Sequence, residues 1–351
     1  MNENNQTPSQ ENEPNSEVNS NTLNNNTEYT PFSGSRIDLS LINQKVSEAR
    51  KEMANYLIGQ HEMVDLLLIG LFSGGHILLE GVPGIAKTLT AKVLARMLSV
   101  DFSRIQFTPD MMPSDIIGTS VFNMKTSEFS YKKGPIFTNI VLIDEINRAP
   151  AKTQAALFEV MEERQITYDS ITHKLAFPFL VIATQNPIEQ EGTYRLPEAQ
   201  LDRFLFKINL DYPTLDEEQN ILKRFRSGKN IDFDKVSAIF SKHDLLEIGS
   251  SIADVRIDNS ILKYIAEITH NTRNHGKLYL GASPRASLSM LKTAKTIAAI
   301  RGRDFVIPED VQFVAFHILN HRIILSPEAE MEGLNEKLMI EEIIKSVEVP
   351  R

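Results

Sequence analysis

The segment HILLEGVPGIAKT, residues 76–88, decides the fold of this chain. Its apolar start is typical of a buried strand, and from Gly81 onward it fits the pattern G-x-x-x-x-G-K-[ST] at every fixed position except one. Ala86 stands where the last glycine belongs. A glycine-rich turn between a strand and a helix lets backbone N–H groups converge on an anion at the positive end of that helix. The segment therefore predicts a phosphate-binding loop in an α/β domain.

Three consecutive side chains carry the chemistry expected of this loop. Lys87 supplies a point charge for the β- and γ-phosphates of a nucleotide, and the hydroxyl of Thr88 can ligate magnesium. Ala86 adds one methyl group beside the phosphates and enters a helix readily, so we expect the loop to work without the glycine. A glycine-rich helix start in an ordinary α/β protein is the alternative, but it does not explain a lysine followed by a threonine. The expected nucleotide-binding residues are Gly81, Val82, Pro83, Gly84, Ile85, Ala86, Lys87, Thr88 and Leu89, with Ile58 and Gly59 beside the adenine.

Polar side chains end two further apolar runs. NIVLIDE, residues 139–145, places Asp144 and Glu145 at the carboxyl end of a buried strand, where ligands bind in open α/β sheets. We expect Asp144 to hold magnesium, usually through water, and Glu145 to orient and deprotonate the attacking water. Asn186, which ends FLVIATQN, is placed to hydrogen-bond the γ-phosphate or that water. Plainer interpretations exist, since an acidic pair is a common helix N-cap and Asn before Pro is a common turn.

Two arginines have the type and position of phosphate contacts. Arg203, in LPEAQLDRF, is expected in a short helix after the sheet, as a finger for a phosphate on a neighbouring subunit. Arg285, in GASPRA, is expected in the first turn of a helix, where the helix dipole disfavours a cation unless an anion answers it. A surface salt bridge is the alternative for Arg203. The segment HEMVD begins like the zinc motif H-E-x-x-H, but Asp65 occupies the second histidine position, so we dismiss a metalloprotease.

The chain divides into three regions. Residues 1–33 are polar with almost nothing apolar, which predicts a disordered tail. In residues 36–212, apolar runs alternate with amphipathic stretches, which predicts a parallel sheet covered by helices on both faces. Two segments interrupt that pattern and are expected to be inserted β-hairpins, at 118–137 and 164–177. Residues 213–345 show helical periodicity only, so we expect a small all-helical domain there.

Composition disfavours several classes of protein. The 351 residues are 42% hydrophobic and 24% charged, which is ordinary for a globular protein of the cytoplasm. The absence of cysteine rules out disulfides and thiolate metal sites. The apolar run VDLLLIGLF is far shorter than the about 20 residues that span a bilayer, so we expect no direct membrane insertion, and no signal peptide is recognisable. The net charge of -9 disfavours broad contact with nucleic acid.

Three stretches together resemble the MoxR family of AAA+ ATPases. They are DEINRAPAKTQAALFEVMEE, ATQNPIEQEGTYRLPEAQLDRF and GASPRA, and the resemblance extends from about Ser40 to Leu325. Within it, GVPGIAKT resembles the Walker A motif, VLIDE Walker B, ATQNP sensor 1, LDRF the arginine-finger region and GASPRA sensor 2. The family often has alanine before the Walker lysine, as at Ala86. The two hairpins correspond to the helix-2 insert and the insert before sensor 1 of this clade.

The resemblance implies a magnesium-dependent ATPase with an AAA+ core and a helical lid. Such proteins form a ring, commonly a hexamer, with ATP bound between subunits, and Arg203 would act in trans. The subunit that Arg285 and Arg148 serve is left open. The resemblance also implies a chaperone-like motor that remodels or activates clients, often with von Willebrand factor A domains, or assists metal or cofactor insertion. Partner contact is expected in the ring pore at the hairpin tips, Met124–Glu128 and Asp169–Ile171.

Three other functions stay open on the sequence. A nucleic-acid-translocating motor, resembling the MCM helicases of the same clade, would need basic hairpin tips. Lys125, Lys132 and Lys133 form only a modest basic cluster beside Glu128. No residue of the sequence excludes the function of a chelatase-type motor subunit. A non-catalytic nucleotide-binding module is disfavoured by the intact acidic pair that follows the strand.

Overall fold

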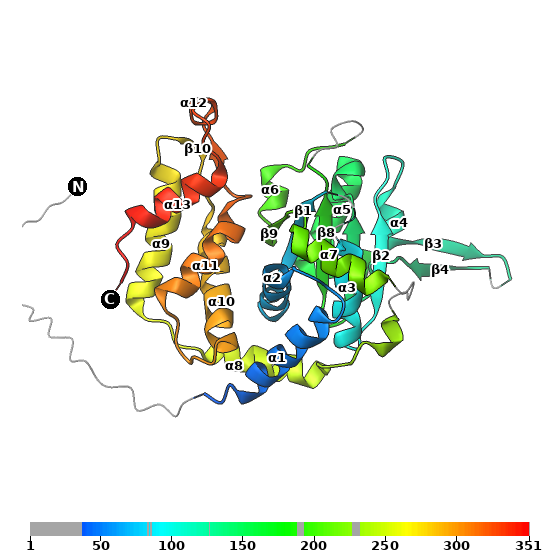
Figure 1. Ribbon diagram of the computed structural model, residues 1–351. Helices are drawn as coiled ribbons and strands as arrows, with labels where there is room; N and C mark the ends of the chain where they lie inside the picture. Colours follow the sequence, from blue (N-terminus) through cyan, green and yellow to red (C-terminus); the bar gives the residue numbers. More distant parts are fainter. Residues whose placement is uncertain are drawn as a thin grey trace, which may run out of the picture. The chain divides into compact units, whose positions relative to one another are not determined.

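Five parallel strands form the central sheet of the first part of the chain (Figure 1). Each is an apolar or β-branched run that the sequence predicts as a strand, namely HILLE, SRIQF, NIVLID, FLVIAT and FLFKINL. In spatial order they are β2 (Phe102–Gln106), β5 (Ile140–Asp144), β8 (Leu180–Gln185), β1 (His76–Gly81) and β9 (Phe204–Leu210). Because parallel strands end at the same edge of a sheet, the segments that follow β1, β5 and β8 come together there.

The computed structural model describes residues 37–82, 84, 86–125, 127–187, 193–226 and 232–350. The tail expected at residues 1–33 lies outside these ranges, and so do Pro83 and Ile85 of the predicted phosphate loop and Thr126 of the first hairpin tip. Within the described ranges, no helix is long and apolar enough to cross a membrane.

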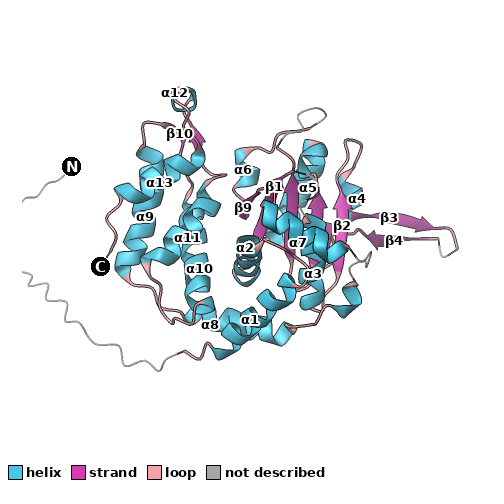
Figure 2. Cartoon of the chain, viewed as in Figure 1, coloured by secondary structure: helices cyan, strands magenta, loops and turns pink. Residues whose placement is uncertain are grey.

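Helices cover both faces of the sheet, which is why its strands are apolar at consecutive positions (Figure 2). The two layers are α1 (Ser40–Ala54), α2 (His61–Phe72) and α3 (Lys87–Met97) on one face, and α4 (Pro113–Ile117) and α5 (Ala151–Glu163) on the other. In β1, Ile77 and Leu79 pack into the first layer and Leu78 into the second, and all three are fully buried. Burial of one such side chain contributes about 2 kcal/mol.

Two antiparallel hairpins are inserted where the sequence predicts them. They pair β3 (Gly118–Asn123) with β4 (Glu128–Lys133), and β6 (Gln165–Tyr168) with β7 (Ile171–Lys174). Figure 1 shows β3 and β4 projecting away from the sheet. A Cβ atom on Gly118 would lie 2.2 Å from the carbonyl oxygen of Lys132, so only glycine lets the two strands close at the base of this hairpin.

After β9 the described chain is helical with one exception. The helices are α7 (Leu215–Phe225), α8 (Lys242–Asp254), α9 (Asn259–Asn274), α10 (Pro284–Ile300), α11 (Pro308–Leu319), α12 (Pro327–Met331) and α13 (Glu336–Ser346), with the short turn η2 (Phe233–Lys235). Thr214 and Glu217 form a capping box at the start of α7, and Glu217 Oε2 accepts from Thr214 N at 2.8 Å. The exception is an antiparallel ribbon of β10 (Leu278–Leu280) and β11 (Ile324–Leu325). Strands this short show no periodicity, so the all-helical expectation misses them.

From Ile37 onward the chain forms one unit, in which a continuous apolar cluster joins the sheet to the helical part. Leu66 of α2, Met290 of α10 and Val314 of α11 are all buried in this cluster. Asn320, just after α11, donates from Nδ2 to the carbonyl oxygen of Lys207 in β9 at 3.0 Å. The helical part is therefore fixed against the sheet through β9.

Candidate functional site

The loop after β1 has a left-handed residue at Ala86. Its φ is 57° and its ψ is 18°, and α3 begins only at Lys87. The expectation that Ala86 enters the helix is wrong, because this residue is the N-cap and lies outside the helix. A left-handed alanine costs roughly 1 kcal/mol relative to glycine. Gly84 has a φ of 90°, and an added Cβ would meet nothing within 4 Å, so glycine is needed there for its backbone and not for space.

Lys87 reaches back across the loop from the first turn of α3. Its Nζ donates to the carbonyl oxygen of Gly81 at 2.6 Å and to that of Gln185 at 3.5 Å, so the ammonium group lies over the ends of β1 and β8. Burial lowers the pKa of Lys87, while nearby carboxylates, Asp144 foremost, act in the opposite direction. The cation is thus held at the positive end of a helix, where an anion is favoured.

One cavity of about 410 Å³ gathers most of the predicted nucleotide site. The predicted residues that line it are Gly84, Ala86, Lys87, Thr88, Leu89, Asp144, Glu145 and Asn186. Among the described residues, Gly81, Val82, Ile58 and Gly59 do not line it. Ile58 and Gly59 lie in the bend between α1 and α2, where Gly59 faces the carboxyl group of Glu217. Their assignment to the adenine stays a prediction.

Asp144 is a buried carboxylate with two polar partners. The residue is 8% exposed, and its Oδ2 accepts a hydrogen bond from Nε of Arg104 at 2.5 Å. Thr184 joins it to the next residue, because its Oγ1 donates to Asp144 Oδ1 at 3.3 Å and accepts from Glu145 N at 3.0 Å. A buried charge needs such partners to offset its lost hydration.

Glu145 is turned toward the cavity by its backbone. Its φ of 57° is left-handed, an uncommon conformation for a residue with a side chain, and it precedes the short turn η1 (Ile146–Arg148). Its Oε2 accepts from Nε2 of Gln106 at 2.8 Å and lies 2.7 Å from Nε of Arg148. The carboxylate is thereby held at the mouth of the loop, beside Asn186, which also lines the cavity.

Arg104 and Gln106 are functional candidates that the sequence analysis misses. They are alternate residues of β2, so their side chains share one face of the strand, and the sheet register pairs Gln106 with Asp144. Two polar residues near the carboxyl end of SRIQF are a visible signal. The signal has no meaning without the strand order, which places β2 beside β5.

The residues in the cavity fit a magnesium-bound nucleotide. Thr88 and Asp144 offer a hydroxyl and a carboxylate oxygen, and hard oxygen ligands are those that magnesium prefers. Among the described residues, no group of three or more His, Cys, Asp or Glu could hold a metal ion. Magnesium is usually bound by one or two protein oxygens together with substrate phosphates and water. The ligands therefore suit an ion that arrives with phosphates.

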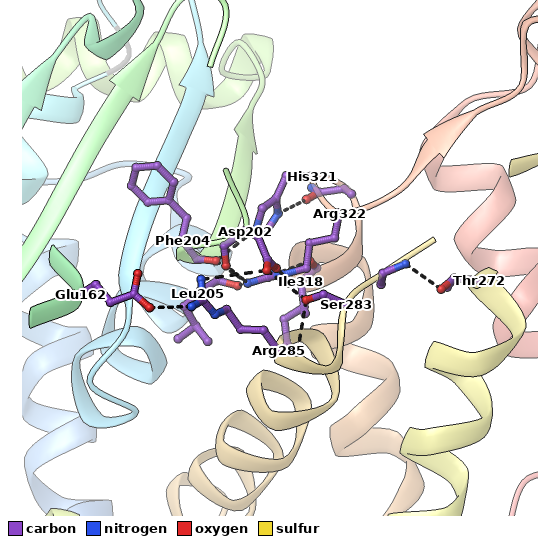
Figure 3. Close-up of polar contacts among 12 residues, drawn as sticks. Glu162, Asp202, Phe204, Leu205, Thr272, Ser283, Arg285, Ile318, His321 and Arg322 are labelled. Carbon is purple, nitrogen blue, oxygen red and sulfur yellow. Dashed lines mark hydrogen bonds and ion pairs between the residues drawn. The ribbon is translucent and has the colours of Figure 1, made fainter. Parts of the chain in front are cut away.

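Arg203 and Arg285 lie together around the carboxylate of Glu162, apart from this cavity. Figure 3 shows the contact between Arg285 and Glu162. Nε of Arg203 is 2.9 Å from Oε2 of Glu162, and Nη2 of Arg285 is 2.7 Å from Oε1 of the same side chain. All three line a second cavity of about 300 Å³, which shares no described residue with the first. The sequence predicts Arg203 within a short helix, but it lies in the turn between α6 (Glu198–Leu201) and β9. The anion that compensates the unfavourable position of Arg285 at the positive end of a helix is the carboxylate of Glu162.

Arg322 fixes the two segments from which these arginines extend. It is 6% exposed, donates from Nε to Oδ1 of Asp202 at 2.7 Å, and also donates to backbone carbonyl oxygens at the start of β9. Oδ2 of Asp202 accepts from Oγ of Ser283, the N-cap of α10, at 2.9 Å (Figure 3). Asp202 thus links the turn before β9 to the start of α10. No local sequence pattern points to Arg322, because its partners are distant along the chain.

The two inserted hairpins are joined by stacked rings. Tyr131 of β4 lies between Tyr168 of β6 and His173 of β7, with ring centroids 4.9 and 5.0 Å away and interplanar angles of 22° and 21°. Beyond this stack the first hairpin exposes large apolar side chains among polar ones, with Met124 88% and Phe129 72% exposed. Aromatic stacking therefore anchors the bases of the hairpins and leaves an apolar end free for contacts.

Comparison with known proteins agrees with this arrangement. Residues 76–206 match the family model described as "ATPase family associated with various cellular activities (AAA)", and residues 270–343 match the AAA lid domain. YeaC of Bacillus subtilis (strain 168), described as uncharacterized, is 46% identical over 305 residues, which are 87% of this chain and 95% of YeaC. Chaperone MoxR1 of Mycobacterium tuberculosis is 43% identical over 309 residues, 86% of this chain and 81% of that protein. The crystal structure of a protein from Cytophaga hutchinsonii ATCC 33406 matches this chain with a TM-score of 0.83 and 46% sequence identity. The match covers 89% of this chain and 97% of that protein chain.

The parallel sheet, the phosphate loop and the helical lid define the class of AAA+ ATPases. Within that class, the extent and identity of the matches decide the family. The chain belongs to the MoxR family.

Proposed function

We propose that this protein is a magnesium-dependent ATPase that hydrolyses ATP at the subunit interfaces of a homo-oligomeric ring, and that it thereby remodels or activates client proteins. The observation that carries the proposal is the gathering of Lys87, Thr88, Asp144, Glu145 and Asn186 around one cavity. Phosphate hydrolysis needs groups that hold the phosphates, the metal and the attacking water, and these side chains are of the required types.

Each residue in the cavity has a role that its chemistry supports. Lys87 and the N–H groups at the start of α3 bind the β- and γ-phosphates. Thr88 and Asp144 hold magnesium, which when bound neutralises charge on the phosphates. Glu145 orients and deprotonates the attacking water, and Gln106, whose Nε2 is 2.8 Å from its Oε2, sets the direction of that carboxylate.

The two arginines lie apart from the cavity that Lys87 lines, and this separation supports the proposal of a ring. Arg203 and Arg285 line the other cavity, and no described residue is shared between the two. We infer that they contact the terminal phosphate bound by a neighbouring subunit, as fingers that act in trans. Such a head-to-tail interface uses different surfaces on the two partners, and it closes into a ring when the rotation permits. A hexamer is the size common in the family.

The client is proposed to be a protein. The relative MoxR1 carries the name chaperone. The exposed Met124 and Phe129 give the hairpin of β3 and β4 an apolar end, which suits contact with a polypeptide. The resemblance to MoxR proteins favours clients with von Willebrand factor A domains, or a part in metal or cofactor insertion.

Replacement of one carboxylate tests the hydrolytic role. Glu145→Gln keeps the size of the side chain but cannot accept a proton. We therefore expect ATP affinity within about twofold of the wild type and phosphate release slower by about 10²- to 10³-fold. Glu159→Gln, on the exposed side of α5, is the matched control. Wild-type turnover in Glu145→Gln would overturn the assignment, and turnover that rises on addition of DNA would favour a nucleic-acid motor.

The same variant identifies the client. A ring that binds ATP without hydrolysing it should retain whatever it grips, so co-purification with Glu145→Gln should enrich a specific protein over the wild type. The sample loaded with ADP is the control. Enrichment of DNA in place of a protein would contradict the proposed client class.

A further inference from the structure

Glu162 lies between the cationic side chains of Arg203 and Arg285. None of the catalytic motifs accounts for this position. The residue lies in the last turn of α5 and is bound through Oε2 by Arg203 and through Oε1 by Arg285. The side chains are partly open to solvent, 39% for Glu162, 33% for Arg203 and 43% for Arg285. The pairs are therefore accessible to an incoming anion, and their geometry matters more than their contribution to stability.

The carboxylate removes an obstacle to bringing two arginines together. Two like charges held close together repel each other even at the effective dielectric of a protein surface. An anion between them offsets this repulsion and restricts the rotamers of two long side chains, so that less rotamer freedom is lost on binding. Arg203 and Arg285 are consequently held as a pair before any ligand arrives.

The contacts leave the donors that a phosphate needs. Arg203 uses Nε toward Glu162, and within the described chain its Nη1 and Nη2 have no hydrogen-bond partner. Arg285 uses Nη2 toward Glu162, and its Nη1 is 4.0 Å from Asp202. The terminal fork of Arg203 is thus free to bind two oxygens of one phosphate, which is the favourable geometry for a guanidinium group.

We propose that Glu162 is a positioning residue that aligns Arg203 and Arg285 as one unit for the terminal phosphate of the nucleotide bound by the neighbouring subunit. This inference rests on the proposed function, since it requires that phosphate to be presented in trans. The network of Asp202, Arg322 and Ser283 fixes the backbones of the two arginines, and Glu162 fixes their guanidinium groups. In this arrangement Glu162 acts on hydrolysis only through the two arginines.

The test compares steady-state ATP hydrolysis by the full-length chain and four variants. Glu162→Gln should lower kcat about tenfold and leave KM for ATP within about twofold, because misplaced groups affect the transition state more than ground-state binding. Glu162→Asp keeps the charge and should recover part of the loss. Glu163→Gln, an exposed neighbour on the same helix, is the matched control and should behave as the wild type. Arg203→Ala measures the loss of one finger.

The double variant separates positioning from a structural effect. If Glu162 acts through the arginines, Glu162→Gln should lower kcat less than about twofold further in an Arg203→Ala background, since residues that share one interaction are not additive. A full tenfold further loss there would overturn the proposal. So would a rise in kcat in Glu162→Gln alone, which would make the carboxylate a competitor of the phosphate.

The variants separate the role of Glu162 from the role of Arg203. If Arg203→Ala loses turnover while Glu162→Gln matches Glu163→Gln, the finger stands and the positioning role is overturned. If Arg203→Ala keeps wild-type turnover, the finger assignment is overturned and the positioning role falls with it.

Discussion

Arg104 donates a hydrogen bond from Nε to Oδ2 of Asp144 at 2.5 Å, so the carboxylate assigned to magnesium is already paired with a cation. Thr184 occupies the other oxygen at 3.3 Å. The guanidinium group offsets the lost hydration of a buried carboxylate. A metal ion that approaches Asp144 must compete with it.

This competition predicts that removal of Arg104 tightens metal binding. In Arg104→Gln the carboxylate loses its cationic partner, and the incoming dication no longer meets a positive charge. We expect the Kd for Mn²⁺, used as a probe for Mg²⁺ on the ADP-bound protein, to fall roughly tenfold. Electron paramagnetic resonance of free Mn²⁺ measures this constant directly. Arg96→Gln, which breaks an exposed 3.4 Å pair with Asp234, is the control, and an unchanged or larger Kd in Arg104→Gln would refute the competition.

Replacement of alanine by glycine should have opposite effects on stability at Ala86, where the backbone is left-handed, and at Ala91, inside α3. Ala86→Gly relieves the strain at φ 57°, and we expect a gain in unfolding free energy of about 0.5–1 kcal/mol, reduced by the added freedom of the unfolded chain. Ala91→Gly, in the interior of α3, should cost about 1 kcal/mol. Chemical denaturation of both variants checks the signs. A loss of stability in Ala86→Gly would show that the methyl group has a packing role that outweighs the strain.

The trans arrangement predicts recovery of activity in mixed rings. Lys87→Ala should bind nucleotide about a hundredfold more weakly, because a charge-assisted contact is lost, and Arg203→Ala should bind nucleotide but hydrolyse it much more slowly. In a ring of both subunits, some interfaces combine an intact Lys87 with an intact Arg203. Random mixing makes about a quarter of the interfaces competent in a head-to-tail ring, so phosphate release should approach a quarter of the wild type. Mixed rings that assemble and stay inactive would mean that Arg203 serves its own subunit.

Buried His76 predicts a loss of stability in acid. Burial is the main cause that lowers the pKa of His76 from 6.5 to about 4, and Val181 N donates to its Nδ1 at 3.0 Å, so the ring is neutral. Between pH 6.5 and 4 the unfolded chain therefore binds a proton that the folded chain does not. Stability is full above pH 6.5, declines as the pH falls, and has lost about 3 kcal/mol from this residue once the pH is below 4.

His76→Gln isolates this effect from other titrating groups. The amide can donate to the Met161 carbonyl oxygen and accept from Val181 N, the two contacts that the ring makes at 3.0 Å each, but it does not titrate. The unfolding free energy of the variant, measured from pH 7 to 4, should fall less steeply than that of the wild type. Parallel curves for the two proteins would exclude His76 as a source of the acid sensitivity.

Local patterns were sufficient for most of the fold. The five strand runs and the two hairpins lie where alternation and apolar runs predict them, because these signals depend on residues a few positions apart. The ribbon of β10 and β11 was missed because pairing of such short segments depends on partners distant in sequence. Ala86 shows a different limit, since helix propensity describes helix interiors and says little about the φ of an N-cap.

For the site, the motif residues were predictable and their partners were not. Lys87, Thr88, Asp144, Glu145 and Asn186 each follow a strand, and parallel strands bring such ends together in any sheet of this type. Arg104 and Gln106 required the strand order as well. Arg322 required the position of the helical part against β9.

By itself, then, the sequence determined the α/β core, the phosphate loop and the residue types around it, because these are written in short-range periodicity and in one contiguous motif. Only the tertiary structure decided which distant charges meet. Glu162 and Arg285 are separated by 123 positions, and their 2.7 Å contact forms where Ser283, the N-cap of α10, is bonded to Asp202 in the turn before β9. No local pattern specifies such a pair, since it depends on two separate apolar clusters, one that buries a face of α10 and one that buries a face of α5.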